Sequence, residues 1–273
     1  MANFGIGEIY GFPLRDTSEA AKATREAARC PFKGGDCSKK GGVCTLTDGS
    51  SFPIVCPQRF RQGNVLFDSI AELAFGAGKR YVVLSEIPFL EATSKEDTRK
   101  HVGNIDNILV ELDDESEIVD WCALEVQAVY FSGTSMGKEI KSFLEEGIVR
   151  EPASRRPDFR SSGPKRLLPQ LETKVPTLRR WGKKMFVAID KPFLDWLPSF
   201  REENDLSNAD ICWLSFELDT NVTPYRIALH SSHYATLESS REGLVAGAPP
   251  PKSEFEDRVL KAIRADSKII YSN

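Results

Sequence analysis

Four cysteines near the start of the 273-residue chain, Cys30, Cys37, Cys44 and Cys56, constrain its fold more than any other feature. Their spacing, C-x6-C-x6-C-x11-C, is wider than the C-x2-C knuckles of common zinc modules. Glycines between them allow the tight turns that would bring four sulfurs to one centre. Four clustered thiols in a reducing compartment are typical of metal binding rather than of disulfides. We therefore expect a structural iron or zinc ion, with unpaired thiols in a small core as the alternative.

Length and hydropathy limit the remaining possibilities. No apolar run approaches the ~20 residues of a membrane-spanning helix, so we expect no membrane insertion. Residues 1–9 lack the charged and apolar pattern of a secretion signal, which favours a cytoplasmic protein. The chain suits one α/β domain with a small appended module, and we predict a cysteine module over residues 1–62 and a larger domain over 63–273. Cys122 and Cys212, each beside a tryptophan, are expected in the core.

The formal net charge of -4 conceals an uneven distribution. Residues 150–184 contain 11 Lys or Arg and only three acids, so this segment carries +8 and the remainder about -12. A solvated helix face is the ordinary explanation of a basic run. A run this concentrated in an acidic chain nevertheless favours contact with a polyanion.

Apolar periodicity predicts a mixed α/β domain. The order is helix, three strands, two helices and a strand. Apolar stretches follow, and then a last amphipathic helix, which we expect to pack on the core or to support a dimer. The expected helices span residues 64–75, 135–146, part of 162–181, and 253–265; the expected strands span 80–90, 104–112, 118–130 and 185–189, with apolar stretches at 211–218 and 226–229.

Two acids lie in predicted strands where a charge needs a partner or a metal. Asp106 stands at the start of one apolar strand and Glu125 inside the next. Strand alternation places Glu125 and Gln127 on one face, and both converge with Asp106 if the two strands form a hairpin. Glu86 is the preferred third acid, and the other candidates are Glu91 and Glu72.

Paired carboxylates suit phosphodiester hydrolysis. They can hold a magnesium ion, which polarises the phosphate and acidifies a water, while a neighbouring Gln127 orients the attacking water. The alternative is that Asp106 and Glu125 are strand acids that point to solvent or accept hydrogen bonds from loops.

Several motifs, taken together, resemble those of one family. They are Cys30-Pro31-Phe32, Cys56-Pro57-Gln58-Arg59-Phe60, Asn104-Ile105-Asp106, Glu125-Val126-Gln127-Ala128, and Arg156-Pro157-Asp158 followed by Phe159-Arg160-Ser161-Ser162. Over most of its length the chain resembles type II restriction endonucleases of the NotI kind, a branch of the PD-(D/E)xK nucleases.

The resemblance implies a homodimeric, magnesium-dependent enzyme of a restriction-modification system, working beside a cognate DNA methyltransferase. It would cut double-stranded DNA at a GC-rich palindrome and leave 5′-phosphate and 3′-hydroxyl ends. Asp106 and Glu125 would bind magnesium, and Gln127 would take the place of the superfamily's usual lysine. The four cysteines would hold iron in a DNA-contacting module.

The basic segment would then line the DNA cleft, with some side chains on phosphates and some on guanine edges. The first candidates are Arg155, Arg156, Arg160, Lys165 and Arg166. A competing function is a metal-stabilised DNA-binding regulator without nuclease activity, which has no need of paired strand acids. A repair nuclease with little sequence preference is a third possibility.

Overall fold

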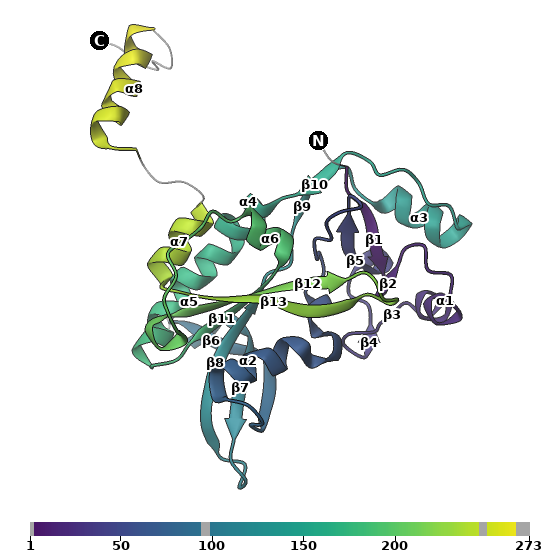
Figure 1. Cartoon of the computed structure of the whole chain (residues 1–273), viewed down its shortest axis with the longest axis horizontal. Coiled ribbons are helices and arrows are strands. Elements are labelled where there is room, and N and C mark those ends of the chain that lie inside the picture. Colours follow the sequence, from purple (N-terminus) through teal and green to yellow (C-terminus); the bar gives the residue numbers. More distant parts are fainter. Residues whose placement is uncertain (1–2, 94–98, 246–249, 266–273) are drawn as a thin grey trace.

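The computed structural model describes residues 3–93, 99–245 and 250–265, and its centre is a six-stranded mixed sheet (Figure 1). The strand order is β13-β12-β11-β8-β7-β6. The three middle strands, β12, β11 and β8, run parallel, and the outer pairings are antiparallel. The bounds are β6 (Tyr81–Thr93), β7 (Arg99–Leu112), β8 (Ile118–Val126), β11 (Met185–Asp190), β12 (Ile211–Asp219) and β13 (Arg226–Ala235).

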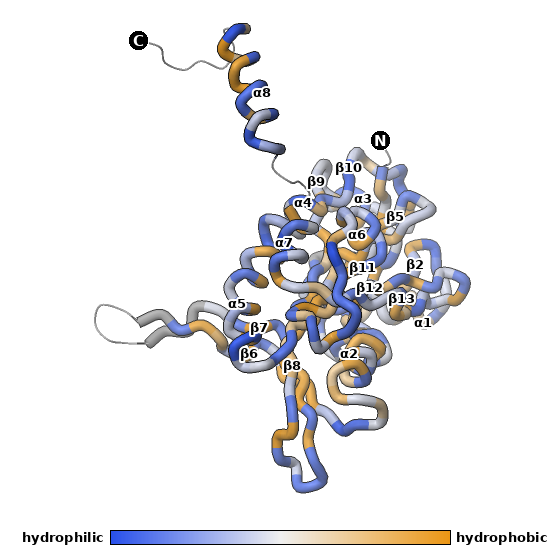
Figure 2. The backbone as a smooth tube through the Cα atoms, turned by 60° about the vertical axis from the view of Figure 1, so that its left-hand side comes forward, coloured by the Kyte–Doolittle hydropathy of each residue, from blue (hydrophilic) through white to orange (hydrophobic). Residues whose placement is uncertain are grey.

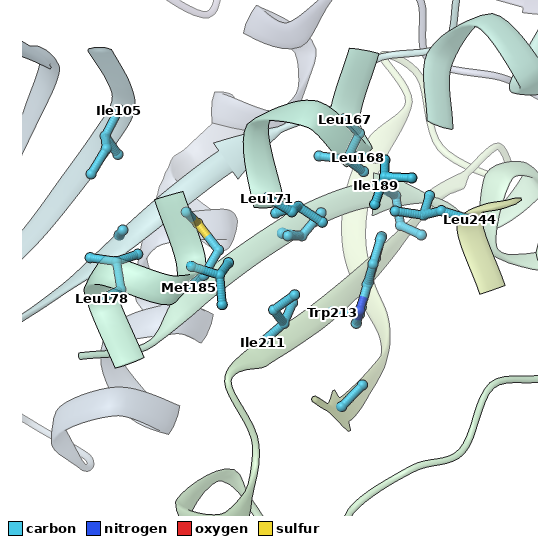
Figure 3. Close-up of a cluster of buried hydrophobic side chains, with 14 of the residues drawn as sticks. Ile105, Leu167, Leu168, Leu171, Leu178, Met185, Ile189, Ile211, Trp213 and Leu244 are labelled. Atoms are coloured by element: carbon cyan, nitrogen blue, oxygen red, sulfur yellow. The ribbon is translucent and has the colours of Figure 1, made fainter. Parts of the chain in front are cut away.

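Helices cover both faces of this sheet. All six residues of β11 are buried, as expected for a central parallel strand covered on both sides. Val187 packs with Leu171 of α5 (Leu168–Arg180) on one face, and Phe186 packs with Ile70 of α2 (Val65–Phe75) on the other. Figure 3 shows the α5 side of this core, with Leu171 close to the strands. The other helices of this region are α4 (Phe159–Ser162), which continues through a π-helical turn into α5, α6 (Lys191–Trp196) and α7 (Leu237–Val245).

A second layer contains the N-terminal residues. It has a three-stranded sheet in the order β2-β1-β5 and a short β3-β4 hairpin. Its apolar core joins Ile9 and Leu46 to Phe131, Ile140 and Phe143 from the middle of the chain. The first 62 residues therefore share a core with a later segment. The elements are β1 (Gly5–Ile9), β2 (Phe12–Pro13), α1 (Glu19–Glu26), β3 (Arg29–Cys30), β4 (Gly35–Asp36), β5 (Val43–Thr47), β9 (Phe131–Gly133), α3 (Gly137–Glu146) and β10 (Arg155–Pro157).

Two buried polar contacts join the N-terminal layer to the central domain. The guanidinium of Arg59, in a 3-10 segment, binds both carboxylate oxygens of Glu8 on β1, at 2.9 and 3.1 Å, and both side chains are fully buried. The carboxylate of Asp190, at the end of β11, accepts a 2.6 Å hydrogen bond from the backbone N–H of Ile54. Burial makes the loss of either partner costly, so these contacts fix the layer on the sheet.

The last described helix, α8 (Lys252–Arg264), has no buried residue. Its apolar side chains Phe255, Val259, Leu260 and Ile263 are exposed. Figure 2 shows hydrophobic and hydrophilic segments mixed along α8, which stands apart from the sheet. Packing of this helix on the core, one of the two expectations, is therefore not seen. Within the described ranges, no helix combines the length and apolar character needed to cross a membrane.

Candidate active site

The register of three neighbouring strands aligns three acids. β7 pairs antiparallel with β8 through Asn107 and Leu124, so the next position brings Asp106 level with Glu125. β6 pairs with β7 through Ser85 and Asn107 and through Ile87 and Ile105, which sets Glu86 level with Asp106. β7 and β8 thus form the hairpin on which the expected convergence depended, and it places Asp106 beside Glu125.

Asp106 is partly buried at the end of its pairing with β8. Its Oδ2 accepts a 3.2 Å hydrogen bond from the backbone N–H of Val126. Burial raises the pKa of Asp106, and the negative charge of Glu86 raises it further, while the Val126 N–H and the ammonium of Lys174 oppose the shift. The carboxylate therefore lies where a nearby cation would stabilise its charged form.

Glu125 is only 1% exposed, and its two carboxylate oxygens differ in their hydrogen-bond partners. Oε1 accepts a hydrogen bond from the ammonium of Lys174 on α5, which also donates to Gln170 Oε1 at 2.9 Å. Oε2 is buried and has no hydrogen-bond donor among the described residues. Burial raises the pKa of Glu125 to about 7, the charge of Asp106 adds to the rise, and Lys174 opposes it. A buried oxygen without a donor is costly, and either a bound cation or a proton offsets that cost.

Gln127 lies just beyond β8 and is buried. Its backbone N–H donates to the Ala188 carbonyl at 2.9 Å, and its side-chain Nε2 donates to the Ala128 carbonyl at 2.6 Å. It lines a cleft of about 390 Å³ together with Tyr130 and Arg166. Neither Asp106 nor Glu125 is among the described residues that line this cleft, and no hydrogen bond joins the Gln127 amide to either acid.

The three candidates for a third acid lie in different places. Glu86 is exposed on β6, accepts a 3.3 Å hydrogen bond from Asn104 Nδ2, and has a φ of 55°, which is rare for a residue with a side chain. Glu91 is exposed farther along β6, opposite His101. Glu72 is exposed on α2, which covers the other face of the sheet. Of the three, Glu86 is level with Asp106.

The five basic residues singled out by sequence differ in their surroundings. Arg155 is buried on β10, where its guanidinium binds both oxygens of Glu139, at 2.8 and 2.6 Å, and the carbonyls of Phe4 and Thr134. This geometry favours a structural role for Arg155. Arg166 is exposed, with its guanidinium 3.6 Å from the centre of the Tyr130 ring at the cleft. Arg156, Arg160 and Lys165 are also exposed.

Much of the positive charge of residues 150–184 is engaged in contacts within the chain, although Arg150 and Arg179 remain exposed. The contacts are Arg150 with Ser142, Arg155 with Glu139, Lys174 with Glu125, Arg179 with Asp210 and Glu238, Lys183 with Asp120, and Lys184 with the carbonyls of Ser207 and Ala209. Lys174 and Gln170 were not among the residues that sequence reasoning selected. The available signal was a lysine within the apolar positions Leu171, Val175 and Leu178 of one helix.

The four N-terminal cysteines lie in the second layer, Cys30 on β3, Cys44 on β5, and Cys37 and Cys56 in loops. Cys30, Cys44 and Cys56 are buried and Cys37 is partly buried. Burial raises the pKa of Cys56, and the charges of Cys30 and Cys37 raise it further, while Gln58 and Lys39 oppose the rise. In the described part of the chain, however, no three or more His, Cys, Asp or Glu side chains are grouped closely enough to hold a metal ion. Cys122 and Cys212 are core residues, as predicted.

A mixed sheet covered by helices, with acids aligned across three strands, fits the α/β fold of nucleases. The family described as Restriction endonuclease NotI matches residues 13–229, and the chain belongs to this family. Membership indicates a type II site-specific deoxyribonuclease, which binds double-stranded DNA. No curated protein matches the chain.

Proposed function

We propose that the protein is a magnesium-dependent type II restriction endonuclease that hydrolyses double-stranded DNA at a specific GC-rich palindrome. The observation that carries this proposal is the pair of adjacent acids on β7 and β8, in which Glu125 Oε2 is buried and has no donor among the described residues. Buried carboxylates without sufficient partners are costly to fold, and metal binding is a common compensation. We interpret the sheet and its acids as a PD-(D/E)xK core.

The chemistry of the donors fits magnesium. Asp106 and Glu125 supply hard carboxylate oxygens, and the cation would bind at Asp106 and at Glu125 Oε2. When bound, it supplies positive charge to the phosphate and acidifies a water. In the reaction the water oxygen attacks phosphorus, the bond from phosphorus to the 3′ oxygen breaks, and a 5′-phosphate and a 3′-hydroxyl remain.

Gln127 and the exposed basic residues would place the DNA and the water. Gln127 is held by the ends of β8 and β11 at the cleft, where an amide can orient a water by hydrogen bonds. Arg156, Arg160, Lys165 and Arg166 are the candidates for phosphate and guanine contacts. Arg155, bound to Glu139, would act by holding β10 against α3.

The remaining features of the proposal concern assembly. Cutting both strands of a palindrome requires two symmetry-related sites, which favours a homodimer. A cognate DNA methyltransferase would protect the host sequence.

The four cysteines would hold one structural iron or zinc ion in the DNA-contacting N-terminal layer. The burial of Cys30, Cys44 and Cys56 supports this, because metal binding compensates buried sulfur ligands and contributes to folding.

The test is digestion of a mixed-sequence plasmid in the presence of magnesium. The parent protein is expected to yield discrete fragments, and Asp106→Asn is expected to bind the same DNA without cutting it, because one carboxylate ligand is lost. Asp114→Asn, in the exposed turn of the same hairpin, is the matched control and should cut normally.

Each outcome separates the candidate functions. Nicks or smears from the parent protein would indicate a nuclease with little sequence preference. Intact plasmid in magnesium and manganese, with tight binding to one sequence, would indicate a regulator that binds DNA. Cutting by Asp106→Asn at the parental rate would remove Asp106 from the site.

A further inference from the structure

We propose that Lys174 is the positioning residue of this site. Its ammonium binds Oε1 of Glu125 and thereby orients Oε2, which has no donor in the described part of the chain, as a ligand beside Asp106. The inference rests on the proposed nuclease function, since it assigns Glu125 to cation binding.

The first support is the burial of Lys174. The residue is 3% exposed and lies among the apolar residues Leu171, Val175 and Leu178 on the inner side of α5. Lysine is almost never buried without a partner, because removing an ammonium from water is costly. Its contacts with Gln170 and Glu125 supply that partner and direct the charge toward the acids.

The second support is the division of roles between the oxygens of Glu125. Oε1 is bound by Lys174, whereas Oε2 has no donor in the part of the chain that the structure describes. A carboxylate held through one oxygen has a restricted rotamer, so its other oxygen is presented in one direction. Without Lys174, Oε1 would lose its ammonium donor, and the repulsion from Asp106 would no longer be opposed by that charge.

The third support comes from Gln127. Its amide is neutral, and its NH2 group donates to the Ala128 carbonyl rather than to either acid. The positive charge near Glu125 is therefore provided by Lys174 on α5, which lies 49 positions farther along the chain.

The experiment measures calcium binding by calorimetry on the full-length protein, because calcium binds carboxylates without needing catalysis as a readout. Lys174→Met keeps the length of the side chain and removes its charge. We expect a loss of about 10- to 100-fold in calcium affinity, the usual effect of removing a residue that orients a metal ligand. DNA binding without divalent cations should be unchanged, and DNA cleavage in magnesium should fall.

The matched control is Lys79→Met. Lys79 pairs with Glu111 at 2.9 Å on β7, the strand that carries Asp106, but outside the site. The calcium affinity of the Lys79→Met variant should equal that of the parent. Gln170→Leu provides a second variant in case Lys174→Met fails to fold, because it removes only the second contact of the ammonium. We expect it to weaken calcium binding in the same direction but less.

Calcium affinity within about twofold of the parent in both Lys174→Met and Gln170→Leu would overturn the proposal, as would an equal loss in Lys79→Met. The proposed function fails separately. If the parent does not cut DNA, or Asp106→Asn cuts at the parental rate, the nuclease assignment is lost even where Lys174 affects calcium binding. If Asp106→Asn is inactive and Lys174→Met retains both calcium binding and cleavage, only the role of Lys174 is wrong.

Discussion

Asp190 is a fully buried acid that connects two layers of the molecule. It caps α6 by accepting a 2.8 Å hydrogen bond from the Phe193 N–H, and it accepts a second from Ile54 in the N-terminal layer. Burial raises the pKa of Asp190 to about 7, the charge of Asp195 adds to the rise, and the two N–H donors oppose it. Its protonation is therefore linked to folding.

The folded chain retains a proton on Asp190 that the unfolded chain releases above about pH 4. This contribution to stability is present at low pH and is lost as pH rises toward 7. We expect the free energy of unfolding of the parent, relative to Asp190→Asn, to fall between about pH 5 and 7 by no more than ~1.4 kcal/mol per unit. Urea unfolding of both proteins at each pH measures this difference. A difference that is flat or rises with pH would contradict the prediction.

At the scale of elements, the sequence predicted the part of the site that regular strands build. Alternating apolar residues indicated the two strands that carry Asp106 and Glu125, and the hairpin follows from them. Lys174 could not be found this way, since its partner is distant in sequence and Pro169 and Pro176 obscure the helical pattern of α5. The burial of Arg155, which lies on β10, depends on its ion pair with Glu139 on α3.

The N-terminal layer was predicted less well for a related reason. The structure has strands β1 and β5 there, which the residue pattern did not indicate. These strands have five residues each, and β9 and β10 have three. Runs this short carry little periodicity, and their apolar residues are buried by partners from the middle of the chain. The prediction of a cysteine module over residues 1–62 did not anticipate that shared core.

Helix α8 is an element whose removal should leave the folded core unchanged. None of its residues is buried, so a chain that ends at Pro250 should unfold within about 2 °C of the parent, as measured by differential scanning calorimetry. Light scattering on the same two proteins reports whether the exposed apolar residues contribute to self-association. A drop of several degrees in a protein that remains monomeric at every concentration would show that α8 packs on its own core.

At the scale of the whole molecule, two buried contacts couple the N-terminal layer to the sheet, and the four cysteines lie within that layer. If the thiols hold one metal ion, Cys56→Ser should lower the metal content per chain and the unfolding temperature together, because a structural metal contributes to folding. Elemental analysis of protein prepared without added zinc measures the content and distinguishes iron from zinc. Cys212→Ala, in the central core, is the control and should keep its metal. Equal metal content in the parent and Cys56→Ser would contradict the tetrathiolate proposal.

The alignment of acids across β6, β7 and β8 also determines where the chain can tolerate a change in length. One residue added to β7 between Asp106 and Leu112 would move every side chain on one side of the insertion to the opposite face of the sheet. Either Asp106 or its apolar neighbours would then point to the wrong face. The turn between β7 and β8, with Asp114, Glu115 and Ser116 exposed, has no such constraint. Related sequences should therefore vary in length at this turn while keeping the spacing within β7, and a peptide tag inserted there should leave the nuclease site intact.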